Sequence, residues 1–294
     1  MKTRLGGERS FRRFALITLG IMTILSLLPV ILIVIASFTD ENSLIANGYS
    51  YFPAKWSLDA YFYMVKQVKL ITRAYGISFF VTITGTLLSV LFTTTLAYPM
   101  SRKDFKFSKI LTFLVFFTML FNGGVVPSYM MWSQFFHLKN TIWALILPSV
   151  FSVWNMFLLR TYFSAISPSL YEAAILDGAN YFQIFWRITV PLSKTTLLTV
   201  GMMYALAFWN DWWNALMFIN SKDLFPLQYY LYNILSNVNA VSSGRIPAGA
   251  SGIQLPAETV KMAVTMITIG PIIFLYPFVQ KYFVNGIMTG AVKE

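Results

Sequence analysis

One short stretch of the sequence gathers side chains that could bind a polyhydroxylated ligand. From 209 to 214 the chain reads WNDWWN, which places indole rings beside amide groups and one carboxylate. Sugars are bound by such groups, because a flat ring covers the apolar face of the sugar while amides and carboxylates bond its hydroxyls. An interfacial aromatic belt with a snorkelling acid would have the same composition. The predicted substrate-path candidates are Trp209, Asn210, Asp211, Trp213 and Asn214, with Trp154 and Asn155 as a second pair.

The sequence lacks the cysteines, histidine clusters and motifs that mark many catalytic and metal sites. The chain has no Cys, which excludes disulfides, thiolate metal sites and cysteine nucleophiles. Its one His, His137, lies between Phe136 and Leu138 in a short connection, where we expect a solvated surface residue. The sequence has no G-x-x-x-x-G-K-S/T phosphate loop, HExxH helix or Ser/His pair. We therefore expect a chain that is not an enzyme and binds no metal or cofactor of its own.

The composition indicates an integral membrane protein. Hydrophobic residues make up 57% of the 294 positions and charged residues 11%, and the mean hydropathy is +0.63. Soluble domains usually carry about a quarter charged residues. The net charge of +11 lies at the ends of hydrophobic segments, which argues against nucleic-acid binding.

Six segments are apolar and long enough to cross a hydrocarbon core, which needs about 20 helical residues. They predict an all-α fold with six transmembrane helices. Interrupted helices are predicted by Pro29, Pro148 and Pro271 in three of them and by Asn122-Gly123-Gly124 with Pro127 in another. Helices kinked around a pathway and ordinary bundle packing both explain such breaks. The predicted spans are Phe14 to Phe38, Ala74 to Tyr98, Ile110 to Trp132, Thr141 to Leu159, Thr195 to Ile219 and Met262 to Val279.

The basic residues predict the orientation of these spans. Most of the 22 Lys and Arg residues fall before the first span, between the second and third, between the fourth and fifth, and in the tail. Cytoplasmic loops carry this excess, so both termini are predicted to be cytoplasmic. Residues 1–294 then form a single transmembrane domain with outer loops at 39–73 and 220–257. An unusual element at 167–192 lies on the cytoplasmic side.

The first half of this inner element is predicted to be a short capped helix. Ser167-Pro168 is typical of a helix start, and Ser169 with Glu172 has the spacing of a capping box. Gly178 can take the left-handed conformation that ends a helix.

The second half repeats the pattern and completes an exposed apolar knob. Asn180 and Gln183 again have the capping spacing, and a second short helix runs toward Pro191. A knob of this kind fits a groove in a partner protein. Its predicted apolar members are Leu170, Tyr171, Ile175, Phe182 and Phe185, rimmed by Glu172, Asp177 and Arg187.

The spacing within this element resembles the EAA loop of the permease subunits of bacterial ATP-binding-cassette (ABC) importers. An EAA triplet at 172–174 is followed by Gly178, Ile188 and Val190-Pro191, with Val190 where Leu is usual in the family. The resemblance implies that the element docks into ATPase subunits, whereas a purely structural pair of surface helices is the alternative. The implied coupling residues are Glu172, Ala173, Ala174, Leu176, Asp177, Gly178, Tyr171 and Phe182.

Further segments resemble the carbohydrate-uptake branch, including the smaller maltose permease subunit and permeases for oligosaccharides. They are NTIWA at 140–144, WNDWWNAL at 209–216 and YPFVQKYFVNG at 276–286. The resemblance implies the type I importer fold in the bacterial cytoplasmic membrane. It also implies a second homologous permease, two ATPases that hold ATP and Mg²⁺, and an extracytoplasmic solute-binding protein. By the same resemblance the 220–257 loop reaches the binding protein and the tail from 286 to 294 reaches the ATPases.

The function implied is sugar import by alternating access, driven by partner chains that hydrolyse ATP. A self-sufficient six-span carrier or channel is the alternative. An ion-coupled carrier usually buries carboxylates near the membrane midplane. Of the 11 acids only Asp211 lies within a predicted span, near its outer end, which disfavours the alternative.

Overall fold

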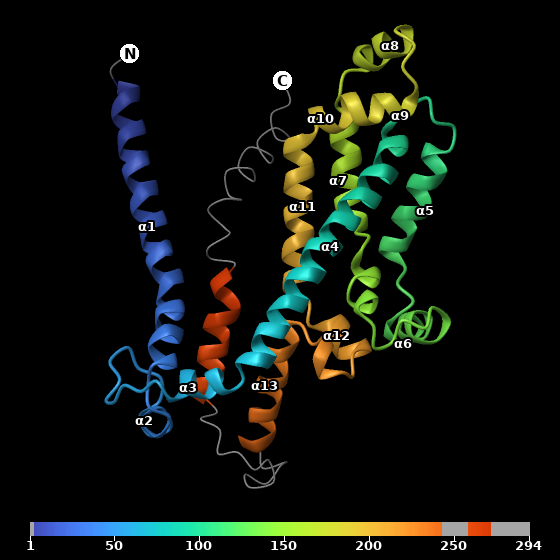
Figure 1. The fold of residues 1–294 in the computed structure, drawn as a ribbon. Helices are drawn as coiled ribbons and strands as arrows, with labels where there is room; N and C mark the ends of the chain where they lie inside the picture. Colours follow the sequence, from blue (N-terminus) through green and yellow to red (C-terminus); the bar gives the residue numbers. More distant parts are fainter. Residues whose placement is uncertain (1–2, 243–257, 272–294) are drawn as a thin grey trace. The chain divides into compact units, whose positions relative to one another are not determined.

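The computed structural model describes residues 3–242 and 258–271, and within them the chain is helical, without a β-strand. Only an isolated bridge joins Thr39 and Trp56. The chain divides into two compact units, one formed by Met1–Val68 with Asn233–Pro271 and the other containing Lys69–Tyr232 (Figure 1). The predicted tail and the part of the sixth span beyond 271 lie outside the described residues, as does the 243–257 part of the outer loop.

The first unit contains one long apolar helix and a folded segment that follows it. Helix α1 (Thr3–Ser37) confirms the first predicted span, since its part Phe11–Ser37 is long and apolar enough to cross a membrane. It continues through Pro29, so the interruption predicted there is wrong. Two short helices follow, α2 (Glu41–Asn47) and α3 (Asp59–Lys66). The carboxylate of Glu41 accepts the backbone N–H groups of Glu258 and Thr259, both at 2.9 Å. It thereby satisfies orphaned donors at the start of the helix at 258–271.

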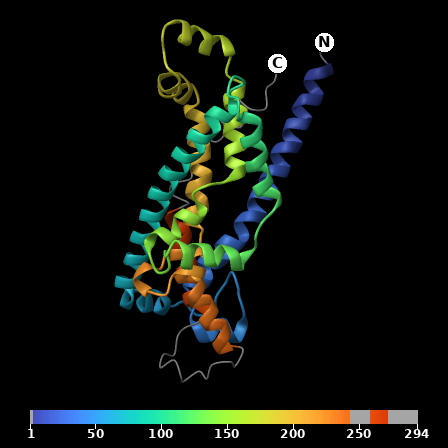
Figure 2. The same cartoon turned by 90° about the vertical axis from the view of Figure 1, so that its right-hand side faces the viewer.

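Four helices of the second unit run alongside one another (Figures 1 and 2). Short elements close the two ends of this group. The long members are α4 (Val68–Ser101), α5 (Ser108–Leu120), α7 (Val153–Ser164) and α11 (Lys194–Trp209). One end carries α8 (Pro168–Leu176), α9 (Tyr181–Ile184), a π-turn at Phe185–Thr189 and α10 (Val190–Leu192). The other end carries α6 (Val125–Met130), a π-turn at Met131–Phe135, 3₁₀ turns at Ile142–Leu145, Leu147–Ser149 and Lys222–Leu224, and α12 (Trp213–Phe218).

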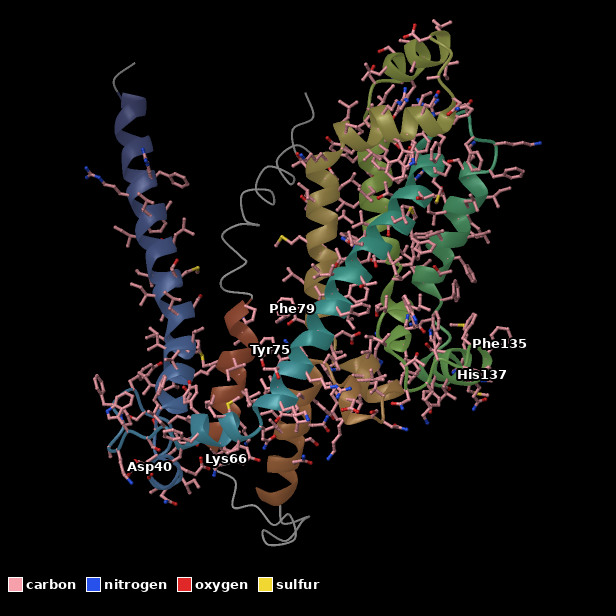
Figure 3. All side chains as sticks on the ribbon, in the orientation of Figure 1. Asp40, Lys66, Tyr75, Phe79, Phe135 and His137 are labelled. Atoms are coloured by element: carbon pink, nitrogen blue, oxygen red, sulfur yellow. The ribbon has the colours of Figure 1, made fainter. Side chains whose placement is uncertain are left out.

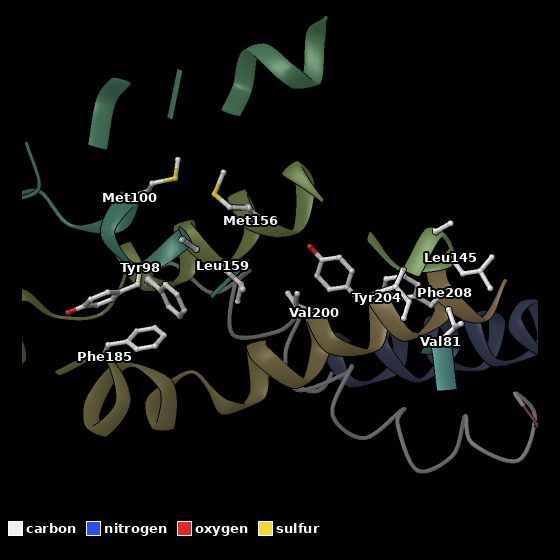
Figure 4. Packing of buried hydrophobic residues seen from close by; sticks show 14 of the residues in the cluster. Val81, Tyr98, Met100, Leu145, Met156, Leu159, Phe185, Val200, Tyr204 and Phe208 are labelled. Atoms are coloured by element: carbon white, nitrogen blue, oxygen red, sulfur yellow. The ribbon is translucent and has the colours of Figure 1, made fainter. Parts of the chain in front are cut away.

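Small residues let α4 and α11 approach closely. The ring of Phe208 lies over Gly85, and the Cα face of Gly201 lies near Val90. Packing through small residues is the usual basis of helix association where apolar burial gives little advantage over lipid. A buried hydroxyl pair adds a directional contact, since Thr93 Oγ1 and the Tyr204 hydroxyl share a hydrogen bond of 2.7 Å. Figure 4 shows Tyr204 and Phe208 within the packed core.

Three predicted spans are not continuous helices. The third predicted span, Ile110 to Trp132, is interrupted, because α5 ends at Leu120 and the next helix is bent away by 113°. Gly124 has a φ of +88°, and its N–H is bound by the Asn122 side chain, so the predicted Asn-Gly-Gly break is confirmed.

The fourth and fifth predicted spans are also interrupted. Residues 142–149 form 3₁₀ turns around Pro148, bent by 50° from α7. Helix α11 ends at Trp209, and the predicted span continues only as the separate helix α12. Among the described residues two helices are long and apolar enough to cross a membrane, or four if each bent pair forms one span. Part of the predicted 220–257 loop is helical, within α13 (Leu227–Ser242).

Candidate functional site

Helix α8 of the inner element begins at the predicted Ser167-Pro168 start, two residues before the N-cap that the Ser169–Glu172 pattern predicts. Ser167 is the N-cap and Pro168 the first helical residue, a place where its fixed φ and missing N–H are favourable. Ser169 lies inside the first turn, and its hydroxyl hydrogen-bonds that of Ser167 at 2.7 Å. The predicted Ser169–Glu172 capping box is therefore wrong, and Glu172 is left exposed on the helix.

The glycine ending of α8 is confirmed. Gly178 has a φ of +83°, its N–H donates to the Ile175 carbonyl, and the Ala179 N–H donates to the Ala174 carbonyl, both at 2.9 Å. This pattern is a Schellman motif, which needs a left-handed residue at the position of Gly178.

A reciprocal capping box then starts α9. The Asn180 side chain accepts the Gln183 N–H at 2.8 Å, and the Gln183 side chain accepts the Asn180 N–H at 2.9 Å. The predicted cap is confirmed, so caps fix both sides of the glycine elbow.

The exposed surface of the element differs in part from the predicted knob. Tyr171 and Phe185 are 5% and 6% exposed, so they pack inward and do not lie on the knob. The cause is helical spacing, since Tyr171 and Ala174 lie three residues apart and share the buried face of α8. Leu176 at 88% and Phe182 at 71% are the most exposed apolar side chains here. The exposed apolar members are Leu170, Ile175, Leu176, Tyr181, Phe182 and Trp186, beside exposed Glu172, Ala173, Asp177 and Gly178.

The buried side of the element rests on the turn between α4 and α5. The Arg102 guanidinium lies 4.2 Å from the centre of the Tyr171 ring, within cation–π range. The same guanidinium makes two bonds of 3.0 Å to the Asp104 carboxylate. Tyr181 donates its hydroxyl to that carboxylate at 3.2 Å. The pKa of Asp104 is lowered, chiefly because the Arg102 side chain hydrogen-bonds its charged form.

Arg102 and Asp104 were not among the site residues predicted from the sequence. In the sequence, Arg102 counts only among the basic residues that predict the orientation. The one local signal is Asp104, an acid inside an otherwise basic turn. Asp104 and Tyr181 lie 77 positions apart in the sequence, so no local pattern of residues predicts their contact.

The C-terminal end of α4 is also bound by its neighbours. The Met100 carbonyl accepts from Arg160 Nε of α7 at 3.0 Å and from Ser108 Oγ of α5 at 2.7 Å. Tyr98 packs its ring on Phe185 with centres 5.0 Å apart (Figure 4). The two connections predicted to be cytoplasmic therefore meet at one end of the unit.

Connections predicted to be external meet at the other end. Asn140, at a φ of +60°, donates its N–H to the Phe218 carbonyl at 2.8 Å. Its side-chain oxygen accepts the N–H groups of Asn220 and Ser221 at 3.1 and 2.8 Å. His137 lies at this end beside Phe135 and is exposed, which confirms the predicted surface position (Figure 3). Tyr75 and Phe79, also labelled there, lie on α4.

The polar groups of the WNDWWN stretch build a helix junction. Asp211 Oδ1 accepts the N–H groups of Trp213 and Asn214 at 2.9 and 3.1 Å, which caps α12. The buried Asn214 amide donates to Asp211 and, at 2.8 Å, to Ser149 Oγ. Asn210 donates to the Leu206 carbonyl at 2.8 Å. These bonds give the amides and the acid a structural role, and a substrate role stays a prediction.

The aromatic members of the predicted substrate path divide by exposure. Trp209 is 5% exposed and meets Phe79 edge to face, with ring centres 5.2 Å apart. Trp213 at 46% and Trp154 at 66% present exposed rings. Asn155 is buried next to Trp154 on α7, and its N–H is bound by Ser152 Oγ. The two exposed indoles are thus the members best placed to meet a ligand.

Comparison with known proteins places the chain among transport permeases. No family model matches it. It is 36% identical to Protein LplC of Bacillus subtilis (strain 168) over 277 residues, 94% of this chain and 92% of that protein. It is 34% identical to the polygalacturonan/rhamnogalacturonan transport system permease protein YtcP of the same strain, over 96% of this chain and 99% of that protein. A chain of a crystal structure of a bacterial ABC transporter involved in the import of the acidic polysaccharide alginate matches with a TM-score of 0.79 and 30% identity. The match covers 94% of this chain and 98% of that one.

Proposed function

This chain belongs to the permease subunits of ABC sugar importers, and we propose that it lines the path of an oligosaccharide across the bacterial cytoplasmic membrane. It is a transport subunit of an oligosaccharide ABC importer. In the proposed cycle, ATP hydrolysis by partner chains switches the path between outward-open and inward-open states.

The exposed tip of α8 and α9 carries the coupling part of the proposal. Leu176 and Phe182 are large apolar side chains with most of their surface exposed, beside the exposed acids Glu172 and Asp177. An apolar tip rimmed by charge is suited to a groove in another protein. The Schellman ending and the second cap give the tip a defined shape, so it can act as a rigid lever.

The proposed complex contains a second related permease, two ATPases with bound ATP and Mg²⁺, and an extracytoplasmic solute-binding protein. Only 6% of the most apolar window of α1 is buried. The remaining apolar surface of this helix is suited to contact lipid or other subunits, which supports the proposed complex. We further propose six spans with both termini cytoplasmic. The shared end of the α4–α5 and α7–α11 connections supports this arrangement.

The substrate proposed is an oligosaccharide. YtcP is named for polygalacturonan and rhamnogalacturonan, and the permease AraQ of Halalkalibacterium halodurans, 28% identical over 95% of this chain, is named for arabinooligosaccharides. The exposed rings of Trp154 and Trp213 are the proposed sugar contacts in this chain.

Reconstitution tests the proposal. Proteoliposomes with this chain alone, and with its partner permease, ATPases and binding protein, are given a mixture of galacturonan, rhamnogalacturonan and arabinan oligosaccharides. We expect ATP-dependent uptake only with the whole set. Uptake by the single chain would support a self-sufficient carrier instead.

A further inference from the structure

We propose that Arg102 and Asp104 are positioning residues that attach the inner element at 167–192, here called the coupling element, to α4, so that movement of the element is passed to α4 as well as to α7 and α11. This inference rests on the proposed function. It adds a connection that is absent from the linear sequence, where the element joins only the fourth and fifth predicted spans.

The first observation is that the pair contacts both short helices of the element. Arg102 covers the ring of Tyr171 on α8, and Asp104 accepts the hydroxyl of Tyr181 on α9. These two contacts lie on opposite sides of Gly178, the elbow of the element. A single ion pair thereby fixes the two helices relative to each other and to the end of α4.

The second observation concerns the ion pair itself. The Arg102 side chain is 13% exposed and engages Asp104 with two nitrogens, a geometry that specifies direction as well as distance. The Asp104 side chain is 45% exposed, so water screens the pair and reduces its contribution to folding stability. Loss of the pair should therefore leave the helices folded and change mainly their placement.

The third observation is that α4 carries the connection into the membrane part of the unit. Arg102 directly follows the last residue of α4. Further along, Thr93 bonds Tyr204 of α11, and Gly85 lies under the ring of Phe208. A displacement of the element is then applied to a helix that contacts α11 between Gly85 and Thr93.

The test uses the whole complex with Arg102→Met, and with Lys103→Met as the control. Lys103 is the exposed neighbour, so its variant removes the same charge from the same turn. Measurements are ATPase co-purification, ATP hydrolysis stimulated by the binding protein with the oligosaccharide mixture, and the melting temperature. For Arg102→Met we expect a fivefold or greater loss of stimulation, within the usual range of coupling between sites, with an unchanged melting temperature. Wild-type stimulation in Arg102→Met would overturn the inference.

Two further variants separate positioning from folding. Tyr181→Phe removes only the hydroxyl that binds Asp104, and we expect a smaller loss in the same direction. The exchange Arg102→Asp with Asp104→Arg restores an ion pair of reversed polarity, and we expect it to recover part of the stimulation lost in Arg102→Asp alone. No recovery together with a lowered melting temperature in every variant would assign the pair to folding and contradict the proposal. If no ATPase co-purifies with the wild-type complex, the proposed function fails. If the wild-type complex retains the ATPase and the variants match it in stimulation, the inference alone fails.

Discussion

The ring of Phe208 on α11 lies so close to Gly85 on α4 that a β-carbon on Gly85 would stand 2.7 Å from it. Phe208 is 4% exposed, so its ring has little room to move aside. This contact sets the distance between α4, to which Arg102 and Asp104 attach the coupling element, and α11, which follows that element in the chain.

Gly85→Ala should therefore destabilise the protein by about 1–3 kcal/mol through overpacking. The matched control is Gly201→Ala on the same interface, where the new β-carbon would meet Val90 at an ordinary 3.5 Å. Because Ala favours a helix over Gly by about 1 kcal/mol, we expect this control to be neutral or stabilising. Thermal unfolding of the purified proteins measures both, and equal behaviour of the two variants would contradict the close contact.

Substitution of Gly178 tests the shape of the elbow. No atom lies within 4 Å of an added β-carbon, so the cost arises from its φ of +83° alone. We expect Gly178→Val to abolish transport and weaken ATPase co-purification, and Gly178→Asn to retain both in part, because Asn tolerates the left-handed conformation. Equal loss in both variants would show that side-chain volume, and not conformation, decides the outcome.

Asn140 should hold the outer connections together through its side chain. Asn140→Gly keeps the left-handed backbone but removes the acceptor of two N–H groups, whereas Asn140→Ala removes the acceptor and adds strain. We expect losses of stability of about 1–2 kcal/mol for Gly and more for Ala. Hydrogen exchange at Asn220 and Ser221 measures the local effect, and unchanged protection in both variants would contradict the role.

Asp211 separates a structural role from a substrate role. Asp211→Ala removes the cap of α12 and should lower stability by about 1 kcal/mol. Asp211→Asn keeps an acceptor oxygen, so we expect near-normal stability and transport. Loss of transport by Asp211→Asn in a stable protein would instead assign the carboxylate to the substrate path.

The acid dependence of ATPase retention should reflect Asp104. Its pKa is lowered in the folded protein, so the pair contributes fully above the pKa of the unfolded carboxyl group and is lost as pH falls through the folded value. We therefore expect the contribution of the pair to ATPase retention to be constant from pH 8 to pH 5. It is measured as the difference in ATPase co-purification between wild type and Asp104→Asn. A difference that disappears near pH 6.5 would point to another titrating group.

Local signals in the sequence predicted the inner element well. The Gly178 ending and the Asn180–Gln183 cap are decided by neighbouring residues, so spacing is sufficient to find them. The Ser169–Glu172 cap was wrong because Pro168 starts the helix earlier. Helical spacing puts Tyr171 on the same face as Ala174, but what that face and Phe185 pack against, Arg102 and Tyr98, is distant in sequence.

Hydropathy located the membrane segments but not their breaks. The break at Gly124 was predicted from its residue types, whereas the end of α11 at Trp209 was not, because Asp211 caps a new helix within an apolar run. The contact of Arg102 with Tyr171 joins residues 69 positions apart and has no local signature.

Cross-linking at Leu176 tests the central claim most directly. The chain has no Cys, so Leu176→Cys, at an 88% exposed position, introduces a unique thiol at the tip of the element. In membranes containing the whole complex, we predict that a short bifunctional reagent joins this thiol to an ATPase subunit from the cytoplasmic side. Persistent absence of that product in membranes that still transport, with labelling of the thiol from the external side, would contradict the account.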